Sequence, residues 1–281
     1  MTKSRIGLSW VSDTHGSLYA LQNVKCVDKS DEAVIILGDV GFNYYLNERD
    51  KKAKEIIMNT TRCYYYCLRG NHEARPQSIS GMQKIYDENV QNWVYMEPEY
   101  PRIRYFLDYG VYVIGGYRVA MIGGAYSIDK WYRLAKAGLS EENNNPKVSG
   151  WFPDEQLTPE EMEEAELLFE TSPKFDFVMS HTAPLAMRPL DKFLSFIDQS
   201  KVDTTMEVWL EKLRYKIKVK YAWLMGHYHI DRIEGPHFEY FYYEVENIED
   251  IAKRWREYNE TQMLDTVRGL APLCAMRMIT E

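Results

Sequence analysis

Five of the six histidines fall in four short polar clusters, which combine imidazoles with carboxylates and an amide. Together with one further aspartate, the side chains of interest are Asp13, His15, Asp39, Asn71, His72, His181, His227 and His229. Oxygen ligands mixed with imidazole nitrogens suit Mn²⁺, Fe or Zn²⁺ better than a thiolate site would. Since one carboxylate can bridge two metal ions about 3.5–4 Å apart, the set is large enough for a two-metal site.

Each cluster follows a run that is typical of a buried strand. The predicted strands cover residues 6–11, 33–37, 63–68, 175–179 and 219–225. Helices predicted over residues 17–25 and 48–58 separate the first three strands, a pattern that indicates a right-handed α/β unit. Because α/β folds keep their sites at the carboxyl ends of the strands, we expect the clusters to meet at one edge of a sheet.

The middle of the chain has a different pattern. Gly115 and Gly116 separate two apolar runs, residues 111–114 and 119–122, and predict a tight hairpin. Residues 128–153 are rich in charge and asparagine, so we expect a surface excursion or lid there, of the kind that often carries specificity. We find no convincing linker and expect residues 1–281 to form a single domain.

Capping patterns mark the start of two helices in the second half of the chain. Thr158 with Glu161 predicts a helix over residues 159–170, and Thr204 with Glu207 predicts another over residues 205–216. The last predicted elements are a strand over residues 238–245 and a helix over residues 248–258.

Composition and charge narrow the class of protein. The net charge of −8 and the pI near 5.4 argue against extensive nucleic-acid binding, which relies on Lys and Arg. The sequence shows no signal peptide and no run long enough to cross a membrane, so we expect a cytoplasmic protein. Cys63 and Cys67 share one predicted strand and lie too far apart for a disulfide, so we expect reduced thiols.

Taken singly, most of these clusters would be ordinary turns at strand ends, but their combination and order are specific. The set Asp-x-His, Gly-Asp, Gly-Asn-His, His and Gly-His-x-His resembles the calcineurin-like metallophosphoesterase superfamily over roughly residues 6–229. The resemblance implies an α/β fold, a four-layer α-β-β-α sandwich with two packed mixed sheets.

The resemblance also implies a binuclear metal centre with a bridging carboxylate, Asp39. One metal would be held by Asp13, His15, Asp39 and His229, and the other by Asp39, Asn71, His181 and His227. His72 would lie near the leaving-group oxygen, where it can donate a proton or stabilise charge. The implied metals are two divalent or trivalent ions, manganese first, with iron, zinc or nickel as alternatives. The implied reaction is in-line attack on phosphorus by a metal-bridging hydroxide.

One motif departs from the serine/threonine phosphatases of this superfamily. Their Gly-Asp is followed by an Asp-Arg-Gly that binds phosphate and supports the catalytic histidine, whereas Asp39 is followed by Val-Gly-Phe-Asn. Another cation must then neutralise the substrate, and the candidates are Lys130, Arg133 and Arg75. Four aromatic residues are candidates for stacking on a base or lining the pocket, although core packing is favoured for them: Tyr126, Trp131, Tyr132 and Trp151.

The predicted function is therefore a metal-dependent phosphoesterase that acts on a phosphate mono- or diester of unknown identity. A serine/threonine-type phosphoprotein phosphatase is the nearest alternative. A non-catalytic scaffold on the same fold is the alternative from another class, although the catalytic histidine and every ligand position are filled here. The sequence leaves the oligomeric state open.

Overall fold

The first of two sheets carries the N-terminal half of the chain. The computed structural model describes residues 8–22, 32–136, 150–193, 198–242 and 246–277, and the sheets have six strands each within those ranges. The spatial order of the first sheet is β1 (Leu8–Val11), β2 (Ala33–Ile36), β3 (Tyr64–Cys67), β6 (Ile103–Phe106), β5 (Asn92–Met96) and β4 (Gln83–Asp87). β1, β2, β3 and β6 run parallel, and antiparallel pairings add β5 and β4.

The second sheet carries the C-terminal half. Its order is β11 (Arg232–Glu234), β12 (Phe238–Tyr240), β10 (Lys218–Met225), β9 (Lys174–Ser180), β8 (Tyr117–Ile122) and β7 (Tyr109–Ile114). The four central strands run parallel, and β11 and β7 are antiparallel edges. Gly115 and Gly116 have φ of 59° and 88° between β7 and β8, which confirms the predicted hairpin.

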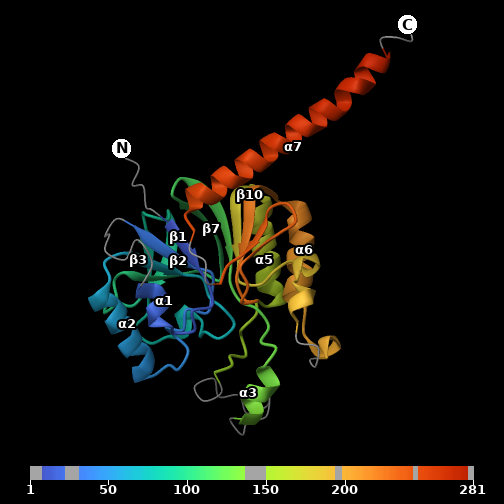
Figure 1. Cartoon of the computed structure of the whole chain (residues 1–281). Helices are drawn as coiled ribbons and strands as arrows, with labels where there is room; N and C mark the ends of the chain where they lie inside the picture. The colour runs from blue at the N-terminus through green and yellow to red at the C-terminus, as the bar shows by residue number, and fades with distance from the viewer. Residues whose placement is uncertain (1–7, 23–31, 137–149, 194–197, 243–245, 278–281) are drawn as a thin grey trace.

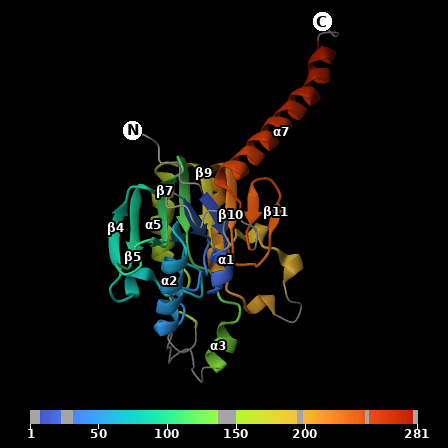
Figure 2. The same cartoon turned by 60° about the vertical axis from the view of Figure 1, so that its left-hand side comes forward.

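The described α-helices are α1 (Leu18–Gln22), α2 (Glu48–Thr60), α3 (Lys130–Lys136), α5 (Pro159–Glu170), α6 (Thr205–Lys216) and α7 (Ile248–Arg277). Of these, α1, α2, α5 and α6 cover the outer faces of the two sheets (Figure 1, Figure 2). α1 and α2 pack through Leu21 and Ile57 on the first sheet, while α5 and α6 pack through Phe169 and Leu210 on the second. The α/β sandwich with α-β-β-α layers is therefore confirmed.

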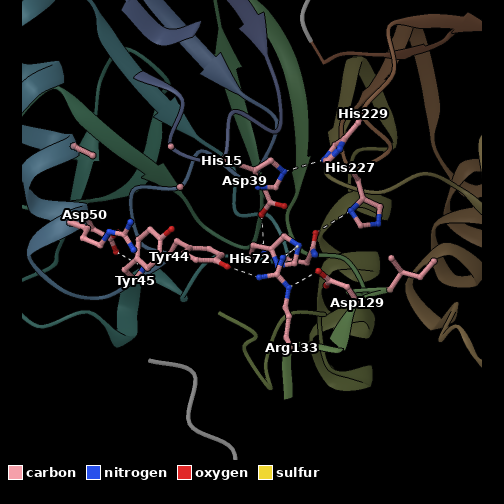
Figure 3. A pocket seen from close by; sticks show the side chains of 16 residues that line it. His15, Asp39, Tyr44, Tyr45, Asp50, His72, Asp129, Arg133, His227 and His229 are labelled. Carbon is pink, nitrogen blue, oxygen red and sulfur yellow. Dashed lines mark hydrogen bonds and ion pairs between the residues drawn. The ribbon is translucent and has the colours of Figure 1, made fainter. Parts of the chain in front are cut away.

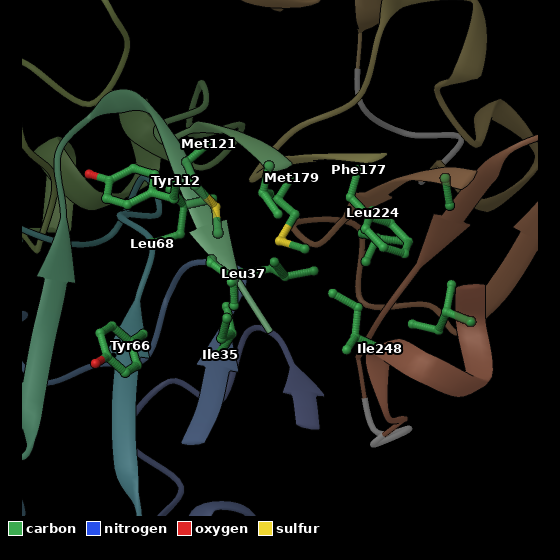
Figure 4. Close-up of a cluster of buried hydrophobic side chains, with 14 of the residues drawn as sticks. Ile35, Leu37, Tyr66, Leu68, Tyr112, Met121, Phe177, Met179, Leu224 and Ile248 are labelled. Atoms are coloured by element: carbon green, nitrogen blue, oxygen red, sulfur yellow. The ribbon is translucent and has the colours of Figure 1, made fainter. Parts of the chain in front are cut away.

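A layer of apolar side chains also fills the space between the two sheets (Figure 4). Ile35, Leu37 and Leu68 come from the first sheet and its strand ends, and they meet Met179 and Leu224 of the second sheet. All five are fully buried, and burial of each such side chain contributes about 1.5–3 kcal/mol. This layer fixes the two sheets against each other and so fixes the strand ends that carry the polar clusters.

The starts of α5 and α6 lie where the sequence predicts them, but only α5 has the predicted capping hydrogen bonds. Thr158 and Glu161 form the predicted capping box of α5. Thr204 occupies the predicted N-cap position of α6, which spans the predicted residues 205–216, but its side chain makes no capping hydrogen bond. Asp203 accepts from the backbone N–H of Thr205 instead, at 2.9 Å, and Glu207 points inward to accept from Thr182.

The C-terminal helix is much longer than predicted. α7 begins against the core through Ile248, Ile251 and Trp255, and then extends away from the sandwich as a single helix (Figure 1). Among the described residues, no helix is both long and apolar enough to cross a membrane. Cys63 and Cys67 are buried and are not joined by a disulfide, as predicted.

Part of the predicted organisation lies outside the described residues, namely residues 6–7, 23–25, 137–149 and 243–245. Of the predicted excursion, the structure describes α3 and the segment from residue 150 onward. α3 lies beyond the ends of the strands, at the opposite end of the molecule from the start of α7 (Figure 1).

Candidate metal centre

All seven predicted ligands gather where the carboxyl ends of five parallel strands face each other. The loops after β1, β2 and β3 approach from the first sheet, and those after β9 and β10 from the second (Figure 3). Several contacts join the sheets. Among them, Nε2 of His15 lies 3.1 Å from Nε2 of His229, and Oδ1 of Asn71 lies 3.0 Å from Nε2 of His181. The structure thus places these residues within one cluster.

The backbone of this cluster is strained. Left-handed φ values occur at five of the seven positions: Asp13 (51°), His15 (45°), Asp39 (51°), His227 (70°) and His229 (51°). Residues other than glycine rarely adopt left-handed φ values, and each such residue costs of order 1–3 kcal/mol. Strain concentrated at converging polar residues is typical of a functional site.

The first half of the cluster contains Asp13, His15 and His229, whose ligand atoms lie within 4.8 Å of one another. Oδ2 of Asp13 accepts hydrogen bonds from Ser12 and from the backbone N–H of His227. Oδ1 of Asp13 is buried and has no hydrogen-bond partner among the described residues, and Nε2 of His229 is 3.6 Å away. Because an unsatisfied buried carboxylate oxygen is costly, a cation fits this position.

The second half of the cluster is built around His181, which is fully buried. Nδ1 of His181 donates to the carbonyl of Leu37 at 2.7 Å, which turns Nε2 toward Asp39 Oδ2, 3.6 Å away. Burial lowers the pKa of His181, but the charges of Asp39 and Asp13 outweigh it and raise the pKa to about 9. The two buried carboxylates therefore attract positive charge here.

His227 completes this half as a neutral imidazole. Burial and the charge of His181 lower the pKa of His227 to about 3, and its Nδ1 lies 3.0 Å from Asn71 Oδ1. Neutral imidazoles, carboxylates and a carbonyl oxygen are the donors that divalent transition metals use. The residues present therefore fit metal ions in both halves.

Two glycines of the motifs cannot be replaced by larger residues, because ligand side chains lie very close to their Cα atoms. A Cβ on Gly70 would lie 2.0 Å from Oδ1 of Asp39, and a Cβ on Gly38, whose φ is +102°, would lie 2.1 Å from Nδ1 of His181. Both distances are far below van der Waals contact, so any larger residue would displace a predicted ligand.

Glu73, to which the sequence analysis assigns no role, joins two of the loops. Its buried carboxylate accepts from the backbone N–H of Gly41 at 2.9 Å and of Gly70 at 3.2 Å. Burial and the charge of Asp39 raise the pKa of Glu73 to about 7. Glu73 thus positions the loops after β2 and β3 without itself facing the cluster.

Asn71 is oriented by two residues that the sequence analysis did not identify. Nδ2 of Asn71 donates to Oγ of Ser127 at 2.8 Å, and Ser127 in turn donates from Oγ and from its backbone N–H to the buried carboxylate of Glu155. This chain fixes the amide so that Oδ1 points at His181 and His227. Partners of this kind set the orientation of metal ligands.

Replacing Ser127 with alanine should therefore weaken metal binding about 10- to 100-fold, because Asn71 would lose the hydrogen bond that orients it. Calorimetric titration of the metal-free protein with Mn²⁺ measures the affinity. Ser78→Ala, which removes a surface hydroxyl, is the matched control. An unchanged affinity in a folded Ser127→Ala protein would contradict the positioning role.

His72 lies beside the cluster rather than inside it. Its backbone N–H donates to Oδ1 of Asp39 at 2.9 Å, and its ring centroid is 5.8 Å from that of His15. Burial lowers its pKa, and the charge of Arg133 lowers it further while that of Asp39 opposes the shift. Nδ1 of His72 is buried and has no hydrogen-bond partner among the described residues.

Arg133 is the one predicted substrate-binding residue that the structure brings to this site. Its Nη2 lies 3.4 Å from Nε2 of His72, and its Nε donates to Asp129 at 2.7 Å. Nη1 donates to the hydroxyl of Tyr44. These contacts hold the guanidinium of Arg133 next to His72, at the side of the cavity formed by α3 (Figure 3).

The structure places the other two predicted substrate-binding residues elsewhere. The guanidinium of Arg75 is buried among acidic partners, Asp108 and Glu161, and joins α5 to the loop after β3. Nζ of Lys130 lies 4.8 Å and 4.7 Å from the ring centroids of Trp131 and Trp151. Neither cation lines the cavity beside the cluster.

That cavity has a volume of about 690 Å³ and opens directly onto the cluster (Figure 3). His15, Asp39, Asn71, His227 and His229 line one end of it. Its other walls come from α3 and from the segment between β2 and α2.

The chain has two mixed sheets, and carboxylate, amide and imidazole side chains meet where the strand ends of the two sheets face each other. This arrangement defines a class of α/β proteins that bind metal ions at that edge. The family model described as calcineurin-like phosphoesterase matches residues 10–231, and the chain belongs to this family. Membership implies a metal-dependent hydrolase of phosphate esters. The resemblance inferred from the motifs is thereby confirmed.

Similarity to individual proteins gives no further information about this chain's function. No curated protein matches the sequence. Among solved structures, a protein of unknown function from Aquifex aeolicus is similar at 16% identity, over 63% of this chain and 80% of that chain. Its TM-score is 0.33, so this likeness carries no argument about fold or function.

Proposed function

We infer that the protein is a metal-dependent phosphoesterase that hydrolyses a phosphate mono- or diester. The observation that carries this proposal is the buried cluster around Asp13, Asp39 and His181, which opens onto a cavity beside a cationic side chain, Arg133. A cluster that attracts positive charge, next to a guanidinium that can bind phosphoryl oxygens, suits phosphoester chemistry.

Under this proposal the seven ligands divide as the family resemblance implies. One cation would be held by Asp13, His15, Asp39 and His229, and the other by Asp39, Asn71, His181 and His227. Bound there, the cations would neutralise phosphoryl oxygens and lower the pKa of a water nucleophile. We propose manganese first, because this donor set suits it, and iron, zinc and nickel accept the same donors.

His72 and Arg133 would contact the substrate together. A guanidinium has no acceptor, so a hydrogen bond from Arg133 to Nε2 of His72 would leave the buried Nδ1–H of His72 without an acceptor. A substrate oxygen beside both side chains would accept from Nε2–H of His72 and from the guanidinium. His72 would then stabilise or protonate the leaving-group oxygen, and Arg133 would fix the phosphoryl group.

Removing the charge of Arg133 should lower kcat/KM about 10- to 150-fold, since a hydrogen bond to a charged group contributes about 1.5–3 kcal/mol. Steady-state hydrolysis of a nitrophenyl phosphate by Arg133→Ala measures this. Lys130→Ala removes a charge from the same helix outside the cavity lining and should change kcat/KM by less than about twofold. Equal effects of the two changes would remove Arg133 from the site.

The proposal is tested by hydrolysis of p-nitrophenyl phosphate and its bis ester, with and without Mn²⁺. Metal-dependent turnover of either ester is expected. A preference for the bis ester would mark a diesterase, and a preference for phosphopeptides would mark a phosphoprotein phosphatase. A metal-free, inert protein would contradict the proposal and favour a scaffold.

A further inference from the structure

The two ligand loops of the second sheet contact each other through residues that do not line the cavity. The loop after β9 contains His181 and Thr182, and the loop after β10 contains His227, Tyr228 and His229. The hydroxyl of Tyr228 lies 3.1 Å from Oγ1 of Thr182. The neighbour of one predicted ligand thus contacts the residue that lies between two others.

Glu207, in the first turn of α6, is the acceptor at the end of this contact. Its Oε1 accepts from Oγ1 of Thr182 at 2.9 Å, and both residues are buried. A threonine hydroxyl has one proton to donate, so the hydroxyl of Tyr228 donates to Thr182. The hydrogen bonds therefore run from Tyr228 through Thr182 to a helix on the outer face of the sheet (Figure 1).

The loop after β10 needs such a contact because its backbone is strained. His227 and His229 have φ of 70° and 51°, and a strained conformation of this kind persists only where surrounding contacts hold it. The ring of Tyr228 packs against that of His227 at a centroid distance of 5.0 Å and stacks on Phe193 at 6.0 Å. The ring and the hydroxyl of Tyr228 together oppose relaxation of the loop.

Thr182 is itself held in place by the neighbouring strands. Nε1 of Trp223, on β10, donates to Oγ of Ser180 at 2.7 Å, and Ser180 donates to the carbonyl of Thr182 at 2.5 Å. All three residues are buried. Thr182 is therefore a fixed point against which the hydroxyl of Tyr228 can be held.

We propose that Glu207 is a positioning residue, which holds the predicted ligands of the second sheet in place through Thr182 and Tyr228. It joins the two ligand loops of this sheet as Glu73 joins the loops after β2 and β3. The inference rests on the metal centre of the proposed function. Because the histidines of the two loops divide between both proposed cations, losing this chain of hydrogen bonds should weaken the binding of both.

The first test measures metal affinity and needs no turnover. Calorimetric titration of the metal-free protein with Mn²⁺ should show affinity lowered about 10- to 100-fold in Tyr228→Phe, which keeps the ring and removes the hydroxyl. Thr182→Val should have a similar effect, and the double variant should add little to either, because the groups act as one chain. Glu207→Gln, which keeps an acceptor for Thr182, should retain most of the affinity that Glu207→Ala loses.

Tyr112→Phe is the control for lost stability. The buried hydroxyl of Tyr112 also makes two hydrogen bonds, with the backbone of Leu107 and of Trp93, in segments that carry no predicted ligand. This variant should lower the melting temperature and leave the affinity for Mn²⁺ unchanged. An unchanged affinity in folded Tyr228→Phe, or equal losses of affinity in the two variants, would overturn the proposal.

The second test uses the metal-free protein, in which the imidazole nitrogen signals of the histidines are followed by nuclear magnetic resonance. In Glu207→Ala the signals of His227 and His229 should shift or broaden, whereas that of His237 should not. Glu211→Ala, one turn further along α6, is the control. Such a change supports the positioning role even if every phosphate ester proves inert, a result that would contradict only the phosphoesterase function. Equal signals in Glu207→Ala and the wild type would overturn the positioning role alone.

Discussion

Replacing Asp39 with asparagine should remove bound metal and activity together. Asp39 is buried at the end of the cavity: its Oδ1 accepts from the backbone of His72, and its Oδ2 faces His181. Burial opposes its ionisation, but the positive charges of His181 and its other neighbours hold the pKa of Asp39 well below the usual range. Asparagine has the same shape and no charge, so the loops keep their positions while both proposed cations lose their shared ligand.

Loss of a residue that only orients a metal ligand typically lowers metal affinity about 10- to 100-fold. Asp39 is itself a proposed ligand, so we expect the metal affinity and kcat of Asp39→Asn to fall by more than about 100-fold. Metal content by elemental analysis and turnover should be measured on the same sample. Asp191→Asn, at an aspartate whose side chain is 58% exposed, is the control. Two full equivalents of metal bound to Asp39→Asn would contradict the assignment of Asp39 as the bridging ligand.

Replacing His72 with alanine should separate metal binding from catalysis. Asp39 accepts from the backbone of His72 and not from its ring, so the variant should keep both metals. The lost ring would no longer donate to the leaving-group oxygen, and general acid catalysis contributes typically about 10²–10⁴-fold. Turnover of alkyl phosphates, which have poor leaving groups, should fall by that amount, and turnover of nitrophenyl esters by less.

The control for this experiment is the sixth histidine. His237 stacks on Trp255 at a centroid distance of 4.7 Å and does not line the cavity, so His237→Ala should retain turnover on both kinds of ester. Equal turnover of alkyl phosphates by the wild type and by His72→Ala would remove His72 from the mechanism.

The site could be predicted largely because its residues follow recognisable strands. The uninterrupted apolar run over residues 33–37 ends directly before Gly38 and Asp39, so the position of the carboxylate follows from local sequence. Parallel strand ends necessarily meet at one edge, which brings distant clusters such as His15 and His229 together. Local pattern and sheet geometry were sufficient for this part.

Residues that act through tertiary contacts gave no local indication. Ser127 reaches Asn71 across 56 residues, and Glu155 reaches Ser127 across 28, with no motif at either position. The ion pairs of Arg75 could not be predicted for the same reason, since its partners Asp108 and Glu161 are remote in sequence.

Of the strands that sequence patterns did not predict, β6 lies inside the first sheet, whereas β4, β5 and β11 lie at or next to a sheet edge. β4 has a mostly exposed side-chain pattern, and Tyr86 on β4 and Trp93 on β5 remain about half exposed, at 48% and 46%. Edge strands lack the continuous apolar run that marks a buried strand. Their existence depends on pairing with the rest of the sheet, which no short window of sequence contains.

The central claim is that the converging side chains form a two-metal phosphoesterase centre, and one titration tests it most directly. Chelator-treated protein should be titrated with Mn²⁺ while bound metal and hydrolysis of bis-p-nitrophenyl phosphate are followed in the same solution. The account predicts two manganese ions per chain, and turnover that rises as the second ion binds. Turnover that is equal in the metal-free and loaded protein, or saturation below one ion per chain, would contradict it.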